Sequence, residues 1–207
     1  MWSRHERGAQ FDTAAPIRAA DFRPDCGTTE ARLGCLAVPS RSVTTIPPQI
    51  RIRRARTSDL AALVELENAA FSSDRISARQ LLQHLGSPSA RVLVATHERD
   101  IVGAAVLFFR AGSRVARLYS IAVAKSARGW GVGAGLLAAA EASARRLGRL
   151  VIRLEVRRDN SAARTLYERR GYRRLGLKKK YYEDGQDALR YEKALARTRG
   201  PALARRR

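Results

Sequence analysis

The pattern of apolar and polar positions divides this chain near residue 49. Residues 1–48 contain five prolines and no sustained period, whereas the stretch from there to about residue 196 alternates short apolar runs with helical spacing. Alternation with a period of two indicates a half-buried strand, and apolar residues three and four apart indicate a helix. The predicted strands are 50–53, 91–96, 101–110, 114–123, 150–156, 172–177 and 187–193, and the predicted helices are 60–66, 78–85, one that ends at Leu147, and 161–170.

The order of these elements predicts the architecture. Three successive strands without a helix between them favour antiparallel pairing, and the later strand–helix–strand unit favours a parallel crossover. We therefore expect an α/β fold with a mixed, mostly antiparallel central sheet of about seven strands, flanked by about four helices. The expected organisation is a poorly ordered extension over 1–48, one domain over 49–196 and a basic tail over 197–207.

The charge of the chain is strongly positive. Its 207 residues include 40 lysines and arginines against 19 acids, a formal net charge of +21. Such a surface attracts phosphates, so a nucleic-acid or ribosomal partner is one interpretation. Of the 40 basic residues 35 are arginine. This bias favours a general feature of the amino-acid composition over selection for binding phosphates, so nucleic acid is not the expected partner. Every uncharged apolar run is too short to span a bilayer, so no membrane partner is expected.

The cysteine content argues against a metal site. Cys26 and Cys35 lack the spacing and the histidine neighbours of a zinc site, so we expect two free thiols and no metal. The first residues carry no apolar segment typical of a signal peptide. Together these features predict a cytoplasmic protein.

The most informative segment is 121–137, which reads as a strand, a short loop and glycines that open a helix. Glycines at a helix N-terminus let backbone amides approach a phosphate, and the helix dipole favours the negative charge. The spacing of Gly131, Gly133 and Gly135 does not fit a dinucleotide fingerprint, and the G-K-[ST] of a P-loop is absent. The remaining alternative is the pyrophosphate loop of acetyl-CoA-dependent N-acetyltransferases, [Q/R]-x-x-G-x-[G/A].

Arg128-Gly129-Trp130-Gly131-Val132-Gly133 matches that loop position by position. Over about residues 50–196 the chain resembles the GNAT superfamily of N-acetyltransferases, and within it most resembles the RimI branch, the bacterial N-terminal alanine acetyltransferases of ribosomal proteins. Further stretches carry this resemblance in the same order: Leu154-Glu155-Val156-Arg157, Asn160-Ser161-Ala162-Ala163, Leu166-Tyr167-Glu168, Gly171-Tyr172, Tyr181-Tyr182, Asp184-Gly185 and Asp187-Ala188.

The resemblance implies a catalytic pair. An amine must lose a proton before it attacks a thioester, and a carboxylate can accept that proton. Glu155 lies on the strand face opposite Ile152 and Leu154, and the resemblance makes it the general base; a surface ion pair is the alternative. Tyr167 would be the general acid that protonates the leaving thiolate. Asn160 is predicted to cap the following helix, and the resemblance implies that it also contacts coenzyme A.

The resemblance also implies binding residues for the expected co-substrate, acetyl-CoA. The backbone of Ile121, Ala122 and Val123 would pair with the pantetheine arm, and one of these amides could stabilise the oxyanion. The pyrophosphate would lie against the segment that begins at Gly129, with charge added by Arg128. That segment comprises Gly129, Trp130, Gly131, Val132, Gly133 and Ala134.

The sequence defines the residues that bind the acceptor less well than those that bind acetyl-CoA. Tyr119, Tyr181 and Tyr182 are the predicted acceptor-binding residues, although core packing is an equal alternative for Tyr119. Three lysines, 178–180, precede the tyrosine pair and could attract an acidic peptide; a solvated turn is the favoured interpretation.

The expected activity is direct acetyl transfer in a ternary complex to the N-terminal α-amine of a protein, such as a ribosomal protein. A small-molecule amine or a protein lysine is the alternative acceptor. A nonenzymatic RNA- or ribosome-binding protein is a third, remote alternative, which the presence of Glu155 and Tyr167 argues against.

Overall fold

The computed structural model describes residues 18–19, 49–71 and 74–195. The helices are α1 (Leu60–Ala70), α2 (Ala78–Gly86), α3 (Val132–Arg146) and α4 (Ser161–Arg169), with short 3-10 turns η1 (Thr57–Asp59) and η2 (Lys125–Ala127). The strands are β1 (Arg18–Ala19), β2 (Ile50–Arg54), β3 (Ala90–His97), β4 (Asp100–Phe109), β5 (Val115–Val123), β6 (Val151–Arg157), β7 (Arg173–Lys178) and β8 (Ala188–Ala194).

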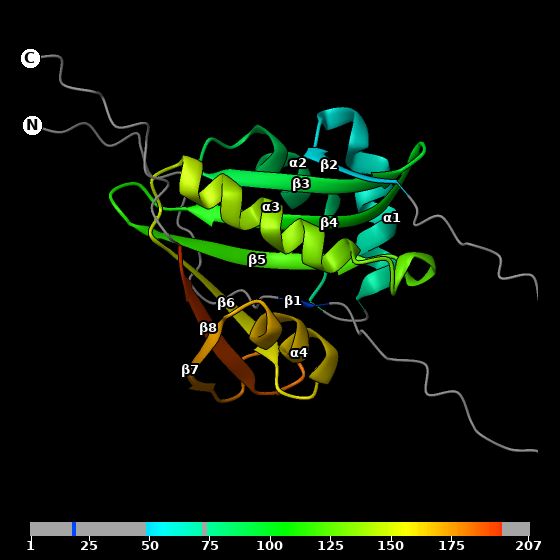
Figure 1. Ribbon diagram of the computed structural model, residues 1–207. Helices are drawn as coiled ribbons and strands as arrows, with labels where there is room; N and C mark the ends of the chain where they lie inside the picture. Colours follow the sequence, from blue (N-terminus) through cyan, green and yellow to red (C-terminus); the bar gives the residue numbers. More distant parts are fainter. Residues whose placement is uncertain (1–17, 20–48, 72–73, 196–207) are drawn as a thin grey trace, which may run out of the picture.

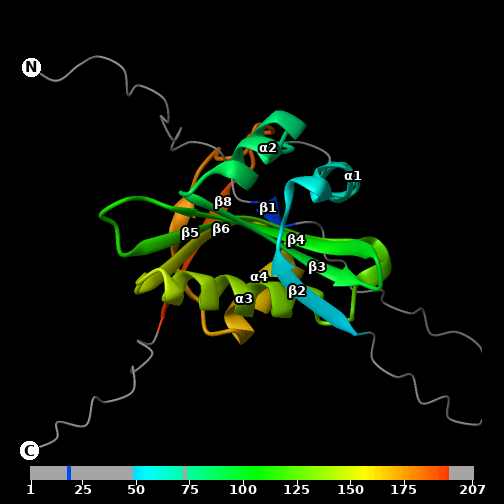
Figure 2. The same cartoon turned by 90° about the horizontal axis from the view of Figure 1, so that it is seen from above.

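One mixed sheet organises the domain, with strand order β2-β3-β4-β5-β6-β8-β7 (Figure 1). Neighbours pair antiparallel except β5 and β6, which are parallel and joined by the crossover helix α3. Helices α1 and α2 cover one face of the sheet, and α3 and α4 cover the other (Figure 2). The predicted α/β fold with a mixed, mostly antiparallel sheet is therefore confirmed.

The parallel pair β5–β6 is short. The paired residues run only from Val115, opposite Val151, to Arg117, opposite Arg153. Beyond these residues, β5 and β6 do not pair with each other. A bulge in β5 follows, since Leu118 pairs with Leu107 but Ser120 pairs with Val106. A bulge bends its strand and increases the local twist. The two strands therefore diverge and leave a slot between their C-terminal halves.

Strand β1 pairs in parallel with β5 at Ser120 and Ile121, on the edge of β5 away from β4, and so lies in this slot (Figure 1). It also approaches β6. The rest of the predicted extension 1–48, including Cys26 and Cys35, lies outside the described residues, as does the predicted tail 197–207.

The core explains why α3 lies so close to the sheet. A Cβ on Gly103 of β4 would sit 2.8 Å from Val132, and a Cβ on Gly135 of α3 would sit 2.9 Å from Ile52. Real Cβ atoms do not approach so closely, so Gly103 is required for close packing of α3 on the sheet, whereas at Gly135 the end of the Ile52 side chain would have to shift. This contact fixes the N-terminus of α3 next to the end of β5. No helix in the described ranges is long and apolar enough to cross a membrane.

Candidate active site

The loop from β5 to α3 presents backbone amides at the end of the slot. Gly129 and Gly131 adopt φ values of +82° and +76°, a left-handed conformation that suits glycine. The first helical hydrogen bond runs from the Gly135 amide to the Gly131 carbonyl. The amides of the first turn of α3 thus have no partner within the helix, and the dipole makes this end attractive to anions.

A groove runs from this loop along α4. Its floor is formed by β5, and its walls come from the start of α3 and from α4. The lining residues are Ile121, Val123, Ala127, Arg128, Gly129, Gly131, Val132, Gly133, Ala134, Ala162, Ala163, Thr165, Leu166, Tyr167 and Arg169. A Cβ on Gly133 would lie 3.4 Å from Leu166 and 3.7 Å from Val123, so glycine keeps the groove open at this point.

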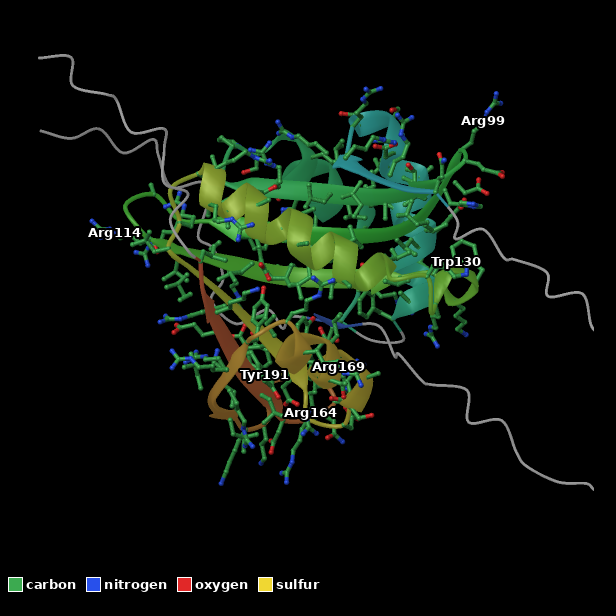
Figure 3. All side chains as sticks on the ribbon, in the orientation of Figure 1. Arg99, Arg114, Trp130, Arg164, Arg169 and Tyr191 are labelled. Atoms are coloured by element: carbon green, nitrogen blue, oxygen red, sulfur yellow. The ribbon has the colours of Figure 1, made fainter. Side chains whose placement is uncertain are left out.

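Two arginines add positive charge to the groove, Arg128 at the loop and Arg169 at the end of α4. Figure 3 shows Arg169 and Arg164 projecting from α4. An exposed anion with apolar neighbours, such as a pyrophosphate followed by an extended amide chain, fits this combination of amides, arginines and apolar walls. The groove therefore fits the expected acetyl-CoA. Within the described part of the chain, no group of three or more His, Cys, Asp or Glu side chains is placed to bind a metal.

Tyr167 closes the inner end of the groove. Its side chain is fully buried, and its hydroxyl has no hydrogen-bond partner among the described residues. Burial raises the pKa of this phenol well above its ordinary value, so the group keeps its proton. Its ring packs against Tyr172 and Tyr191, with centroids 5.7 and 6.2 Å away. The result is a neutral O–H donor held by packing.

Glu155 lies on the other face of the sheet. Its neighbour Leu154 pairs with Tyr191, whose hydroxyl donates to Glu168 of α4, so Leu154 faces α4. Successive strand residues point to opposite faces, so Glu155 faces away from α4, as the sequence predicted. It is 5% exposed and pairs across the sheet with Arg190 of β8.

Three cations surround the Glu155 carboxylate. Arg117 of β5 lies 3.1 Å from it, Arg190 lies 3.5 Å from it, and Lys178 at the end of β7 lies 3.8 Å from it. The predicted turn over 178–180 was thus wrong for Lys178, which is the last residue of a strand, whereas Lys179 and Lys180 are exposed.

Aromatic side chains form the rest of this pocket. The Tyr181 hydroxyl accepts a hydrogen bond of 2.6 Å from Arg117, and the Lys178 ammonium lies 4.6 Å from the centre of the Tyr181 ring. Tyr119, at the bulge of β5, packs against Phe108 and His84. Burial lowers the pKa of His84, so this ring is neutral at neutral pH.

Two loops meet over this pocket. Asp74, between α1 and α2, accepts a 3.4 Å hydrogen bond from the Glu183 amide in the β7–β8 loop. Glu67 of α1 accepts a 2.7 Å hydrogen bond from the Ile76 amide and so holds the first loop in place. Tyr182, which belongs to the second loop, is buried. The side chains around Glu155 thus lie on the opposite face of the sheet from the groove, and β1 lies in the slot between β5 and β6.

The structure brings most of the predicted site residues together, but in two groups. Tyr167 lies with the groove residues, and Glu155 lies with Tyr119 and Tyr181 in the opposite pocket. Trp130 does not line the groove: its indole is 40% exposed and packs edge-on against His97 at 5.1 Å (Figure 3).

Two further predicted residues do not line the groove with their side chains. Asn160 caps α4 as predicted, accepting a 2.9 Å bond from the Ala163 amide. Ala122 is buried against the core.

Sequence reasoning missed three charged residues. Arg117 and Arg190 each interrupt an apolar strand, and a charged residue at such a position indicates an ion-pair partner. Arg169 lines the groove one turn beyond Leu166. Their convergence depends on strand pairing, which the local pattern does not show.

Comparison with known proteins agrees with this geometry. Residues 59–195 match the family described as an acetyltransferase (GNAT) domain. An uncharacterised N-acetyltransferase of Methanocaldococcus jannaschii is 34% identical over 153 residues, which cover 73% of this chain and 96% of the relative.

Two solved structures share the fold closely. A ribosomal-protein-alanine N-acetyltransferase from Escherichia coli superposes with a TM-score of 0.65 at 25% identity, covering 75% of this chain and 99% of the other. A ribosomal-protein-alanine N-acetyltransferase from Brucella melitensis gives 0.62 at 28% identity, covering 70% and 99%. The chain belongs to the GNAT family of N-acetyltransferases, whose members use acetyl-CoA as the acetyl donor.

Proposed function

We propose that this enzyme acetylates the N-terminal α-amine of a protein by direct transfer in a ternary complex. The observation that carries the proposal is the position of Glu155 and Tyr167 on opposite sides of one slot. With the donor in the groove, the acceptor would approach from the Glu155 side of the sheet once β1 leaves the slot. A ribosomal protein is the acceptor suggested by the names of the two structural relatives, and it would place the reaction in the cytoplasm.

Each residue has a defined role in this mechanism. The first-turn amides of α3, with Arg128 and Arg169, would hold the pyrophosphate of acetyl-CoA, which would supply the acetyl thioester. Glu155 accepts a proton from the acceptor nitrogen, which lets that nitrogen form the new N–C bond. Tyr167 holds the proton that the sulfur takes when the C–S bond breaks.

The charge around Glu155 supports an α-amine over a lysine. Arg117, Lys178 and Arg190 each lie within 3.8 Å of the Glu155 carboxylate, and this proximity disfavours an ammonium bound at the same carboxylate. An α-amine has a pKa of about 7.7–8.0 and a lysine one of about 10.4, so the α-amine loses its proton far more readily. The pocket thus favours the acceptor that is already neutral in a substantial fraction near physiological pH.

Two matched peptides test the proposal through release of the coenzyme A thiol. Both begin with alanine and contain one lysine, and one has its α-amine blocked. We expect turnover only with the free terminus, and Glu155→Gln should lower kcat about 100-fold or more, since general base catalysis contributes roughly that much. Glu65→Gln, which changes an exposed glutamate of α1, is the matched control and should leave kcat unchanged. Equal turnover of both peptides would move the acceptor to lysine and overturn the proposal.

A further inference from the structure

We infer that the C-terminal half of α3, together with β2 and β3, forms a second anion site that binds a small phosphate-containing molecule. The inference goes beyond the proposed function and does not depend on it. It comes from a cavity that shares no lining residue with the groove. Three arginines of this cavity have no acidic partner among the described residues.

The sheet forms one wall of this cavity. Ile52 faces α3, because a Cβ on Gly135 would sit 2.9 Å from its side chain. Successive strand residues point to opposite faces, so Arg54, two residues further along β2, faces α3 as well. Its cross-strand neighbour Leu93 shares this face, and so does Arg91, two residues before Leu93 on β3. Both arginines therefore point from the sheet towards α3.

The other wall comes from α3 and the residue that follows it. Positions three and four apart lie on one face of a helix, and the lining residues have this spacing: Ala139, Ser143, Arg146 and Leu147. The cavity has a volume of about 370 Å³, within the range of small-molecule sites. Helix α3 is 15 residues long, so its last turn lies about 20 Å from the amides that face the groove.

Four arginines line the cavity, and an acid neutralises one of them. Arg53 donates two hydrogen bonds to Asp59, of 2.7 and 2.8 Å. Arg54, Arg91 and Arg146 form no ion pair with any described residue. Arg146 is in the last turn of α3, where the helix dipole favours a cation. The dipole does not account for Arg54 and Arg91, which belong to the sheet.

The acids on the surrounding elements do not balance these charges. Strands β2 and β3 contain none, and Glu141, the one acid of α3, binds Lys193 at 2.8 Å. Glu98 and Asp100 lie at the opposite end of β3 from Arg91. Helix α1 lies on the other face of the sheet (Figure 2). Within the described part of the chain, the cavity is therefore positively charged.

Arg91 is the arginine that gains most from a bound anion. Its Nε is buried and has no hydrogen-bond partner among the described residues. Burial lowers the pKa of Arg91, and the charges of Arg54 and Arg146 lower it further. The three guanidinium groups are thus close enough to repel one another. An anion between them would relieve this repulsion and would accept hydrogen bonds from Arg91.

The donor groups of the cavity match a phosphate. Guanidinium groups bind phosphate oxygens through paired, charge-assisted hydrogen bonds. Ser143 is 4% exposed, and its hydroxyl accepts a 3.3 Å hydrogen bond from Arg146. No described residue accepts the proton of this hydroxyl, so it can donate to a phosphate oxygen. The donors line a concave site and not an extended stripe, which favours a small molecule over a nucleic-acid backbone.

The test measures binding of inorganic pyrophosphate by isothermal titration calorimetry. The full chain is first saturated with acetyl-CoA, without an acceptor, so that the groove is filled and cannot bind the probe itself. The same titration is made with Arg54→Gln, Arg91→Gln and Arg51→Gln. Arg51 and Arg54 are both exposed arginines of β2, but only Arg54 lines the cavity. Arg51→Gln is therefore a control with the same loss of charge.

One pyrophosphate should bind per chain. Arg54→Gln and Arg91→Gln should each weaken its affinity about 10-fold, since a hydrogen bond between charged groups contributes roughly that much. Arg51→Gln should leave the affinity nearly unchanged. In a buffer without polyvalent anions, Arg91→Gln should also raise Tm, because it removes one of three cations that repel one another. A purely structural role for Arg91 predicts a lower Tm instead.

Three results would overturn the inference. If pyrophosphate does not bind in the presence of acetyl-CoA, the groove accounts for all anion binding. If Arg51→Gln weakens binding as much as Arg54→Gln does, the attraction comes from diffuse positive charge. If single-stranded RNA binds and pyrophosphate does not displace it, the partner is a nucleic acid. Arg54 is exposed at the end of its strand, so Arg54→Gln decides the matter even if Arg91→Gln does not fold.

Discussion

Replacing Tyr167 by phenylalanine removes a hydroxyl group that is fully buried and, among the described residues, has no hydrogen-bond partner. A buried polar group without a partner destabilises a protein by about 1–3 kcal/mol. The Tyr167→Phe protein should therefore be more stable than the wild type, up to about that amount. For a domain of this size each kcal/mol corresponds to a shift in Tm of about 2–4 °C.

The same substitution should have the opposite effect on catalysis. Loss of a general acid lowers kcat about 100- to 10,000-fold. Thermal unfolding and release of the coenzyme A thiol, measured on the same preparation, give the two quantities. Stability and activity should thus change in opposite directions.

Tyr191→Phe is the matched control. Tyr191 is almost fully buried beside Tyr167, but its hydroxyl donates a 2.6 Å hydrogen bond to Glu168. Its removal should destabilise the protein by about 0.5–1.5 kcal/mol and leave kcat largely unchanged. If Tyr167→Phe destabilises the protein as much as Tyr191→Phe does, the hydroxyl of Tyr167 has a partner in solution. If Tyr167→Phe leaves kcat unchanged, Tyr167 is not the proton donor.

Three other changes probe the groove and the slot. Gly131→Ala should lower the free energy of unfolding by about 1–2 kcal/mol and raise KM for acetyl-CoA, because φ is +76°, whereas Gly86→Ala, without a positive φ, should be neutral in both assays. Deleting residues 1–48 should lower KM for acetyl-CoA several-fold, since β1 pairs with Ile121, where the pantetheine arm is expected; an unchanged KM would refute this competition. Because burial raises the pKa of Tyr167 above its ordinary value, kcat should not decline between about pH 8 and pH 10, and a decline there would contradict a buried donor.

The same pKa shift predicts how stability depends on pH. The unfolded chain loses its tyrosine protons near pH 10, before the buried phenols of the folded domain do, and burial raises the pKa of Tyr181 to about 12. The contribution of these phenols to stability is thus complete below about pH 10 and is lost as the pH rises further. Denaturant unfolding at a series of alkaline pH values measures this loss.

The local pattern of apolar and polar positions was sufficient to predict which strands and helices form. The seven strands and four helices expected from the sequence are present, and Asn160 caps α4 as predicted. Boundaries were less accurate: α1 continues to Ala70 rather than ending at Leu66, because the core it covers extends past the last periodic leucine. Strand β1 was not expected, since two residues carry no period.

The sequence alone also predicted the face of the strand on which Glu155 lies and the position of the glycine loop, because strand alternation and helix capping depend on near neighbours along the chain; the catalytic roles of Glu155 and Tyr167 are implied by the resemblance. The orientation of Glu155 away from Leu154 is an example. Only the tertiary structure decided what surrounds Glu155. Arg117, Lys178 and Arg190 are far apart in sequence and meet because four strands pair in a particular register. Register is set by pairing across the whole sheet, and the set of charged side chains that surrounds Glu155 follows from it.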